Sequence, residues 1–272
     1  MLSHSATPKE FLKSFWINKT LIMTLVKRDV VGRYQNSLFG LLWSFFNPIF
    51  MLAVYTFIFS EVFKARWLGG TNSKAEFALI LFAGLIVFNI FAECFNRAPG
   101  IVLLNANYVK KVIFPLEILA WVNVGAALFH ATICVLVWVI FYFFAIGTPH
   151  ITVLLFPLVL FPLIMLVMGL SWLFAALGAY LRDIAQLAVI LTTVMMFMSP
   201  IFYPIEALPL NYQKFLVLNP LSLAISEMRE VLYWGTVPSI TEYSLYLAMC
   251  ILCAFLGFAF FQKCRKGFAD VL

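Results

Sequence analysis

The longest stretch without a charged side chain constrains this 272-residue chain most strongly. No Asp, Glu, Lys or Arg occurs in the 64 residues from Ile118 to Leu181. A single helix of that length would reach about 95 Å, roughly three times the hydrocarbon thickness of a bilayer. The stretch must therefore turn back, and Gly147-Thr148-Pro149-His150 has the composition of a turn. We predict two membrane-spanning helices, one on each side of it.

The overall composition extends this conclusion to the rest of the chain. Hydrophobic residues make up 64% of it and the mean hydropathy is +1.01, far above the values of soluble domains. Lipid must cover much of that surface. This excludes a cytosolic enzyme and a nucleic-acid-binding protein, despite the net charge of +6.

Four further segments have the composition of membrane spans, which need about 20 mostly apolar residues. They lie between Arg33 and Glu61, from Phe77 to Ala92, from Ile184 to Ile205 and from Tyr243 to Gln262. The second of them extends to Cys94 or Phe95 if Glu93 pairs with Arg97 one turn later. The sequence thus predicts an all-α membrane protein with six transmembrane helices.

The placement of basic residues predicts the orientation of these spans. An even number of spans puts both termini on one side of the membrane. Thirteen Lys and Arg residues then fall on that side and five on the other. Because Lys and Arg collect in cytoplasmic loops, we expect both termini in the cytoplasm.

Two cytoplasmic segments have patterns of their own. Residues 10–33 repeat apolar side chains at helical spacing and predict a helix in the membrane interface, or one packed on a soluble partner. Residues 96–116 form a loop bounded by Pro99 and Pro115, in which 105–111 have room for one or two helical turns. That loop is either a plain basic loop or a docking helix for a cytoplasmic motor.

On the external side, prolines divide residues 201–240 into short apolar pieces, such as Phe215–Leu218 and Leu221–Ile225. Neither piece is long enough to span a bilayer, so we expect re-entrant or interfacial half-helices. They either close a pore or form a loop that rests on the membrane.

The sequence has no recognisable catalytic or metal-binding motif. It lacks G-x-x-x-x-G-K-[S/T], H-E-x-x-H and G-x-S-x-G, and we predict neither catalytic residues nor a metal site. No carboxylate lies at the centre of a span, which argues against an ion-coupled carrier. For His130, inside the third span, packing or an interhelical hydrogen bond is favoured over a ligand role. Energy for transport would have to come from a partner.

Several motifs, in order along nearly the whole chain, resemble those of ABC-2-type polysaccharide-export permeases. They are Lys27-Arg28-Asp29, Arg33-Tyr34, Ser37–Pro48, Val109–Glu117, Arg182-Asp183, Ser199–Pro204 and Asn219-Pro220. The resemblance implies a single transmembrane domain over residues 1–272 that forms a homodimer and binds two copies of a cytoplasmic ABC ATPase. ATP and Mg would bind to that partner, and no cofactor to this chain.

The cargo implied by the resemblance is a lipid-linked polysaccharide moved across the bacterial inner membrane, foremost O-antigen on a polyprenyl-pyrophosphate carrier. Relatives export teichoic acid or capsule. Two other classes stay open: an ABC-2 exporter of drugs or small lipids, and a membrane enzyme that acts on polyprenyl-linked sugars. The enzyme would need converging acids or histidines, and the sequence shows no such cluster.

By the same resemblance, the 96–116 loop couples to the ATPase and residues 205–235 form the external gate. The predicted coupling residues are Asn105, Asn107, Tyr108, Lys110 and Lys111, and the predicted gate residues are Tyr203, Pro204, Asn219 and Pro220.

An anionic lipid head would be attracted by cationic groups at the cytoplasmic surface, and sugar rings stack on aromatic faces. The candidates for the head are Arg28, Arg33 and Arg182, with topological anchoring as the alternative role. The candidates for the glycan path are Tyr55, Phe59, Phe88, Phe91, Trp172 and Phe197, with core or lipid packing as the alternative.

Overall fold

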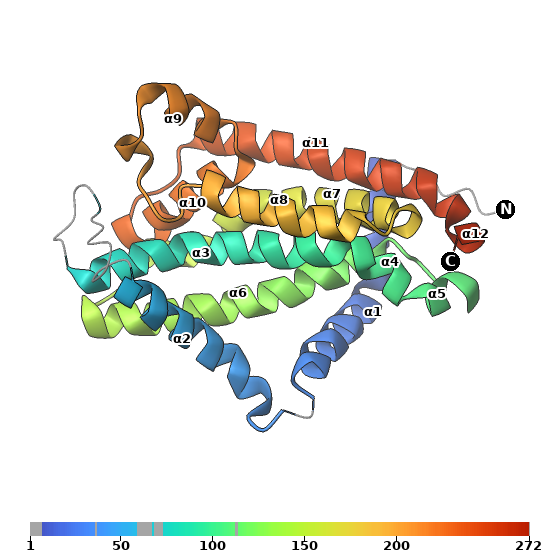
Figure 1. Ribbon diagram of the computed structural model, residues 1–272, viewed down its shortest axis with the longest axis horizontal. Helices are drawn as coiled ribbons and strands as arrows, with labels where there is room; N and C mark the ends of the chain where they lie inside the picture. Colours follow the sequence, from blue (N-terminus) through green and yellow to red (C-terminus); the bar gives the residue numbers. More distant parts are fainter. Residues whose placement is uncertain (1–6, 36, 59–66, 68–72, 112–113, 272) are drawn as a thin grey trace.

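The computed structural model describes residues 7–35, 37–58, 67, 73–111 and 114–271, and every regular element within these ranges is helical. Four long helices run alongside one another and form the body of the molecule (Figure 1). They are α3 (Lys74–Arg97), α6 (Ile118–Ala145), α7 (Phe156–Tyr180) and α11 (Ile240–Cys264). The all-helical prediction is confirmed for the described residues.

Five stretches of the described chain are long and apolar enough to cross a membrane. They are Gly40–Phe57, Lys74–Leu104, Ile118–Ala145, Ile151–Tyr180 and Ile240–Gly267. Each coincides with a predicted span, and the predicted turn at residues 147–150 separates the third from the fourth. Gly147 has a φ of 132° there, a conformation that favours glycine.

The remaining predicted span corresponds to α8 (Ile184–Met198), which is apolar but only 15 residues long. At 1.5 Å per residue it reaches roughly 22 Å, less than the ~30 Å of a bilayer core. The count of six spans therefore stays a prediction.

α3 forms the centre of the core, and side chains around most of its circumference are buried. It packs against α6, α7, α8 and the short helix α10 (Pro220–Arg229). The indole N–H of Trp138 on α6 donates to the carbonyl oxygen of Leu79 at 2.9 Å. α3 is therefore held in place by neighbours around most of its surface.

α7 and α11 approach each other closely because glycines face each other across their interface. A Cβ on Gly257 would collide with the backbone of Gly169, and one on Gly169 with the backbone of Cys253. Small residues at such crossings let membrane helices pack backbone to backbone.

α1 (Pro8–Tyr34) and α2 (Trp43–Phe57) form a V whose apex carries the connecting residues away from the other helices (Figure 1). The Thr7 hydroxyl caps α1 by accepting from the Glu10 amide at 3.4 Å. The predicted helix over residues 10–33 is confirmed, while its place in the membrane interface stays a prediction. Only Ser44 and Leu52 are buried on α2.

Short helices lie at both ends of the bundle (Figure 1). The end that carries both termini has the turn Ala98–Gly100, α4 (Ile101–Leu104), α5 (Ala106–Lys111), the turn Arg265–Gly267 and α12 (Phe268–Val271). The opposite end has the turn Ile205–Ala207, α9 (Leu210–Val217), α10 and the π-helical turn Glu230–Trp234. Helical turns were expected in both regions, and the structure has them. Whether α9 and α10 re-enter the membrane stays a prediction.

Candidate functional site

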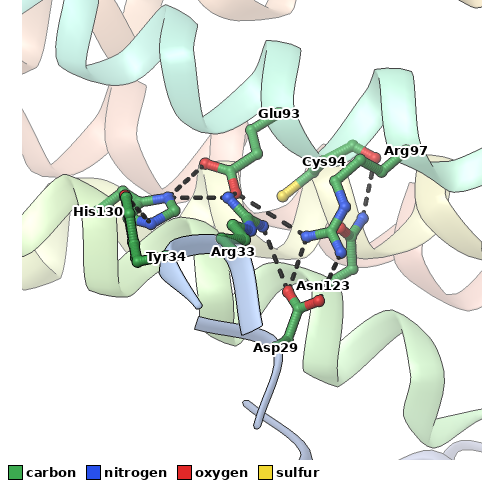
Figure 2. A network of polar contacts seen from close by, with 8 residues as sticks. All are labelled: Asp29, Arg33, Tyr34, Glu93, Cys94, Arg97, Asn123 and His130. Carbon is green, nitrogen blue, oxygen red and sulfur yellow. Dashed lines mark hydrogen bonds and ion pairs between the residues drawn. The ribbon is translucent and has the colours of Figure 1, made fainter. Parts of the chain in front are cut away.

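A network of charged side chains joins α1 to α3 (Figure 2). The two terminal guanidinium nitrogens of Arg97, Nη1 and Nη2, donate to the two oxygens of the Asp29 carboxylate at 2.9 and 2.8 Å. One turn further along α1, Arg33 contacts Asp29 at 3.3 Å and pairs with Glu93 on α3. Two carboxylates and two guanidiniums therefore hold α1 against the core helix.

α6 joins the same network through His130. Its Nδ1 lies 3.0 Å from a Glu93 oxygen, and its Nε2 lies 3.3 Å from the Tyr34 hydroxyl. The interhelical hydrogen bond predicted for His130 is thus confirmed. The sequence left open a pair between Glu93 and Arg97, one turn apart on α3. Their contact is long, at 4.0 Å, and each side chain has a closer partner on α1.

The network keeps its members on α1 charged. Burial raises the pKa of Asp29, but the hydrogen bonds and charges of Arg97 and Arg33 outweigh it, so the pKa lies below its ordinary value. For Arg33, burial lowers the pKa, but the charges and hydrogen bonds of Glu93 and Asp29 outweigh burial. The pKa of Arg33 therefore lies above its ordinary value. Because two carboxylates already compensate Arg33, it has less attraction left for an anionic lipid head, and that role stays a prediction.

Arg28, another predicted head residue, contacts the predicted coupling segment. Its guanidinium donates to the Tyr108 hydroxyl on α5 at 2.9 Å. The Tyr108 ring stacks on Phe114, with centroids 4.4 Å apart and planes 10° from parallel. The contact connects the middle of α1 to the loop that sequence reasoning assigned to ATPase docking.

The other predicted coupling residues lie on or beside α5. The Asn105 amide donates to the Ile101 carbonyl at 2.8 Å and closes the turn between α4 and α5. Asn107 is exposed on α5. Lys110 and Lys111 belong to α5, but their side chains lie outside the described part of the structure.

A second anchor holds the chain just after α5. Arg265, at the end of α11, donates to the Phe114 carbonyl at 2.7 Å and to the Glu117 carboxylate at 2.6 Å. The Ser14 hydroxyl on α1 reaches the other Glu117 oxygen at 3.3 Å. Sequence reasoning missed this pair. The available signal was position, since Glu117 borders the uncharged stretch and Arg265 follows the last span.

A small cavity of about 100 Å³ lies between α1, α4 and α6. Its polar lining consists of Arg28, Asp29, Arg97, Asn105 and Asn123. Arg182, the third predicted head residue, is not among the lining residues and lies exposed in the turn between α7 and α8.

The predicted glycan-path aromatics occupy three kinds of position. Phe88, Phe91 and Trp172 are buried in the core of the protomer. Tyr55 is half-buried on α2, and Phe197 is 63% exposed on α8. Phe59 lies outside the described residues. As a glycan path the set stays a prediction, and within it Tyr55 and Phe197 are the side chains that offer surface.

Two predicted gate motifs meet at the opposite end of the bundle. The Asn219 side chain caps α10 by accepting from the Leu221 amide at 2.9 Å, and it donates to the Ser199 hydroxyl at 2.9 Å. Pro220 begins α10, and the Tyr203 hydroxyl donates to the Phe197 carbonyl at 3.0 Å. Pro204 lines a larger cavity described below. Their gating role stays a prediction.

Comparison with known proteins defines the class. Residues 20–233 match the model of the ABC-2 type transporter family, so the chain belongs to that family. It is 27% identical over 254 residues to the O-antigen export system permease protein RfbA of Klebsiella pneumoniae, an alignment that covers 93% of this chain and 95% of the relative. The predicted resemblance to polysaccharide-export permeases is confirmed.

Relatives named for other polysaccharides match at similar levels. The polysialic acid transport protein KpsM of Escherichia coli is 26% identical over 254 residues, covering 91% of this chain and 95% of the relative. The capsule polysaccharide export inner-membrane protein CtrC of Neisseria meningitidis serogroup A is 25% identical over 284 residues, covering 94% and 96%. With its apolar helices, this chain is a multi-pass membrane permease.

Proposed function

We propose that the chain is the permease subunit of an ATP-driven exporter that moves lipid-linked polysaccharide across the inner membrane, with O-antigen on a polyprenyl-pyrophosphate carrier as the cargo. The observation that carries the proposal is the near-complete alignment with permeases named for polysaccharide export. Both termini face the cytoplasm in this proposal. Capsule polysaccharide is the second candidate cargo, because relatives named for capsule and polysialic acid match nearly as well.

The proposed assembly is a homodimer with two copies of a separate ABC ATPase, which would bind ATP and Mg. The absence of a phosphate-binding loop from this sequence supports a separate motor. Exposed large apolar side chains on α2 and α8, including Phe46, Phe50 and Ile190, support contact with a second copy or with lipid.

The contacts around α5 suggest how the motor would act on the membrane helices. A displacement of α5 would reach α1 through the hydrogen bond between Tyr108 and Arg28. From α1 it would reach α3 through Asp29 and Arg97. Because the connection after α1 leads directly into α2, the first span would move with α1.

Arg28 is the best-placed head ligand of the three predicted arginines. It lines the small polar cavity, and its hydrogen bond is to the neutral hydroxyl of Tyr108, whereas Arg33 and Arg97 contact carboxylates. Its positive charge therefore stays available to a pyrophosphate group.

Export by cells that carry a coupling variant tests the proposal. We expect the Tyr108→Ala, Lys110→Ala double variant to insert normally but to leave lipid-linked glycan on the cytoplasmic side, because the docking segment is altered outside every span. Thr148→Ala, exposed in the turn between α6 and α7 and outside the coupling and gate segments, is the control and should export normally. Normal ATPase binding and export in the double variant would contradict the docking assignment. A drug or a simple lipid as the accumulated cargo would contradict the glycan assignment.

A further inference from the structure

A cavity of about 410 Å³ opens at the end of the bundle opposite α5. It is lined by Trp67, Ile80, Pro204, Ile205, Ser226, Arg229, Glu230 and Trp234. Its volume lies within the ~300–1,000 Å³ range of small-molecule sites. In the proposed topology this end faces away from the cytoplasm.

Arg229 holds the walls of this cavity together. It is buried, and its guanidinium donates to the Ile80 carbonyl on α3 at 3.1 Å and to the Ile201 carbonyl at 2.7 Å. The same group lies 4.4 Å from the centroid of the Trp67 ring. Gly84 makes room for it, since an added Cβ would lie 2.9 Å from an Arg229 nitrogen. These contacts therefore fix α10 against α3 at one wall of the cavity.

The cavity also contains hydrogen-bonding groups without protein partners. The Trp67 indole N–H is buried and has no acceptor among the described residues. Within the same described ranges, the Glu230 carboxyl and the Ser226 hydroxyl make no side-chain hydrogen bond. A ligand would thus meet one donor, one carboxyl acceptor and one hydroxyl that can do both.

The Trp234 ring, the Trp67 indole N–H, a carboxyl and a hydroxyl together match the chemistry of a sugar ring. The C–H faces of a pyranose stack on aromatic faces, and its hydroxyls donate to a carboxyl and accept from an N–H. Trp234 is 40% exposed at the cavity, so its ring is accessible. A phosphate or an acidic sugar would meet Glu230, which interacts electrostatically with Glu227 and Glu242. The lining cation, Arg229, already donates to the Ile80 and Ile201 carbonyls, and the three carboxyls outnumber it.

On this basis we infer that the cavity binds a neutral sugar unit of the glycan on the extracytoplasmic side. The inference rests on the proposed function, because it takes the ligand from the exported cargo. It adds a sugar-binding site formed largely by the predicted gate segment, and a substrate class, a glycan with neutral hexose or deoxyhexose units.

Site-specific photocross-linking in glycan-producing cells tests the inference. A benzophenone amino acid replaces Trp234 in one variant and Tyr212, exposed but not lining the cavity, in the control. After ultraviolet irradiation the purified protein is analysed for periodate-oxidisable sugar and for lipid phosphorus. We expect glycan adducts at position 234 and background levels at position 212.

Carboxyl variants in the same cross-linking protein sharpen the test. Glu230→Gln should lower the glycan adduct by about tenfold, since a hydrogen bond to a charged group is lost. Glu10→Gln, which changes a carboxyl on the first turn of α1 at the other end of the bundle, should leave the adduct unchanged. Equal loss in both variants would contradict a specific site.

The outcomes separate this inference from the proposed function. Phospholipid-only adducts, an acidic glycan in the adduct, or equal yields at positions 234 and 212 would overturn the sugar site while export continues. Absence of ATP-dependent glycan export by the unmodified protein would overturn the proposed function instead.

Discussion

The two ends of the helix bundle handle charge in different ways. At the end with α5, carboxylates meet guanidiniums in three pairs: Asp29 with Arg97, Glu93 with Arg33, and Glu117 with Arg265. At the opposite end Arg229 donates to backbone carbonyls, and Glu227 is 3% exposed with neither carboxyl oxygen hydrogen-bonded within the described chain. Ion pairs between helices allow the end with α5 to pass a displacement from one helix to the next. Carboxyls without a charged partner allow the opposite end to bind protons or ligands.

Removing Arg229 should have the largest effect. Arg229→Ala withdraws the donors to the Ile80 and Ile201 carbonyls and leaves a void beneath Trp67. We expect a loss of ~2–5 kcal/mol in the free energy of unfolding, because buried acceptors lose their partners. Thermal or denaturant unfolding in detergent measures it. Arg182→Ala, an exposed arginine, is the matched control, and equal effects of the two variants would contradict the structural role of Arg229.

The pH dependence of stability should reveal Glu227. Burial raises the pKa of Glu227 to about 7, with Glu230 and Glu242 adding to the effect. The folded state therefore favours the protonated form, so its stability is fully present below the ordinary carboxyl pKa and is lost as the pH rises through about 7. The expected loss is ~1–3 kcal/mol. Unfolding measured from pH 4.5 to 8 should show this loss in the natural protein.

Glu227→Gln should remove that pH dependence, because the amide cannot ionise. Asp29 supplies the contrast between the two ends, since its lowered pKa makes its contribution disappear only as the pH falls into the acid range. Asp29→Asn should therefore leave the decline between pH 4.5 and 8 in place. An unchanged decline in Glu227→Gln would assign it to another group.

The pair of Asp29 and Arg97 should give a moderate effect. A double-mutant cycle with Asp29→Ala and Arg97→Ala should yield a coupling energy of ~1–2 kcal/mol, above that of an exposed pair, because the contact is bidentate and partly buried. Each single variant should also reduce export. A coupling energy near zero would show that this pair does not help to hold α1 against α3.

Tyr108→Phe should give the smallest effect. It removes the hydrogen bond to Arg28 and keeps the stacking on Phe114, so stability should fall by ~0.5–1.5 kcal/mol at most. The ratio of glycan exported to ATP hydrolysed should fall more clearly, if force passes through this contact. An unchanged ratio would place the route from α5 elsewhere, for instance through Arg265.

Sequence patterns predicted the features that follow from local physics. The uncharged stretches marked the long helices, and Gly147 marked the turn between α6 and α7. The prolines in residues 96–116 and 201–240 marked the short helices, because the pieces between the prolines are too short to span a bilayer. These features depend on neighbours in sequence, which the pattern contains.

Features that depend on tertiary contact were not predictable in the same way. The sequence made Arg33 a candidate for the lipid head or a topological anchor, but it did not reveal the pair with Glu93, which is distant in sequence. For Phe88, Phe91 and Trp172 the sequence left a glycan path and core packing as alternatives, and their burial within the protomer depends on which way each helix faces. In a chain with 17% aromatic residues, composition does not tell which face of a helix meets lipid, protein or cargo.

Purification of the tagged protein from its native membranes in mild detergent tests the central claim most directly. The account predicts a stoichiometric ABC ATPase in the preparation, and its loss in the Tyr108→Ala, Lys110→Ala variant. A folded, dimeric permease that repeatedly purifies without any ATPase would contradict the account.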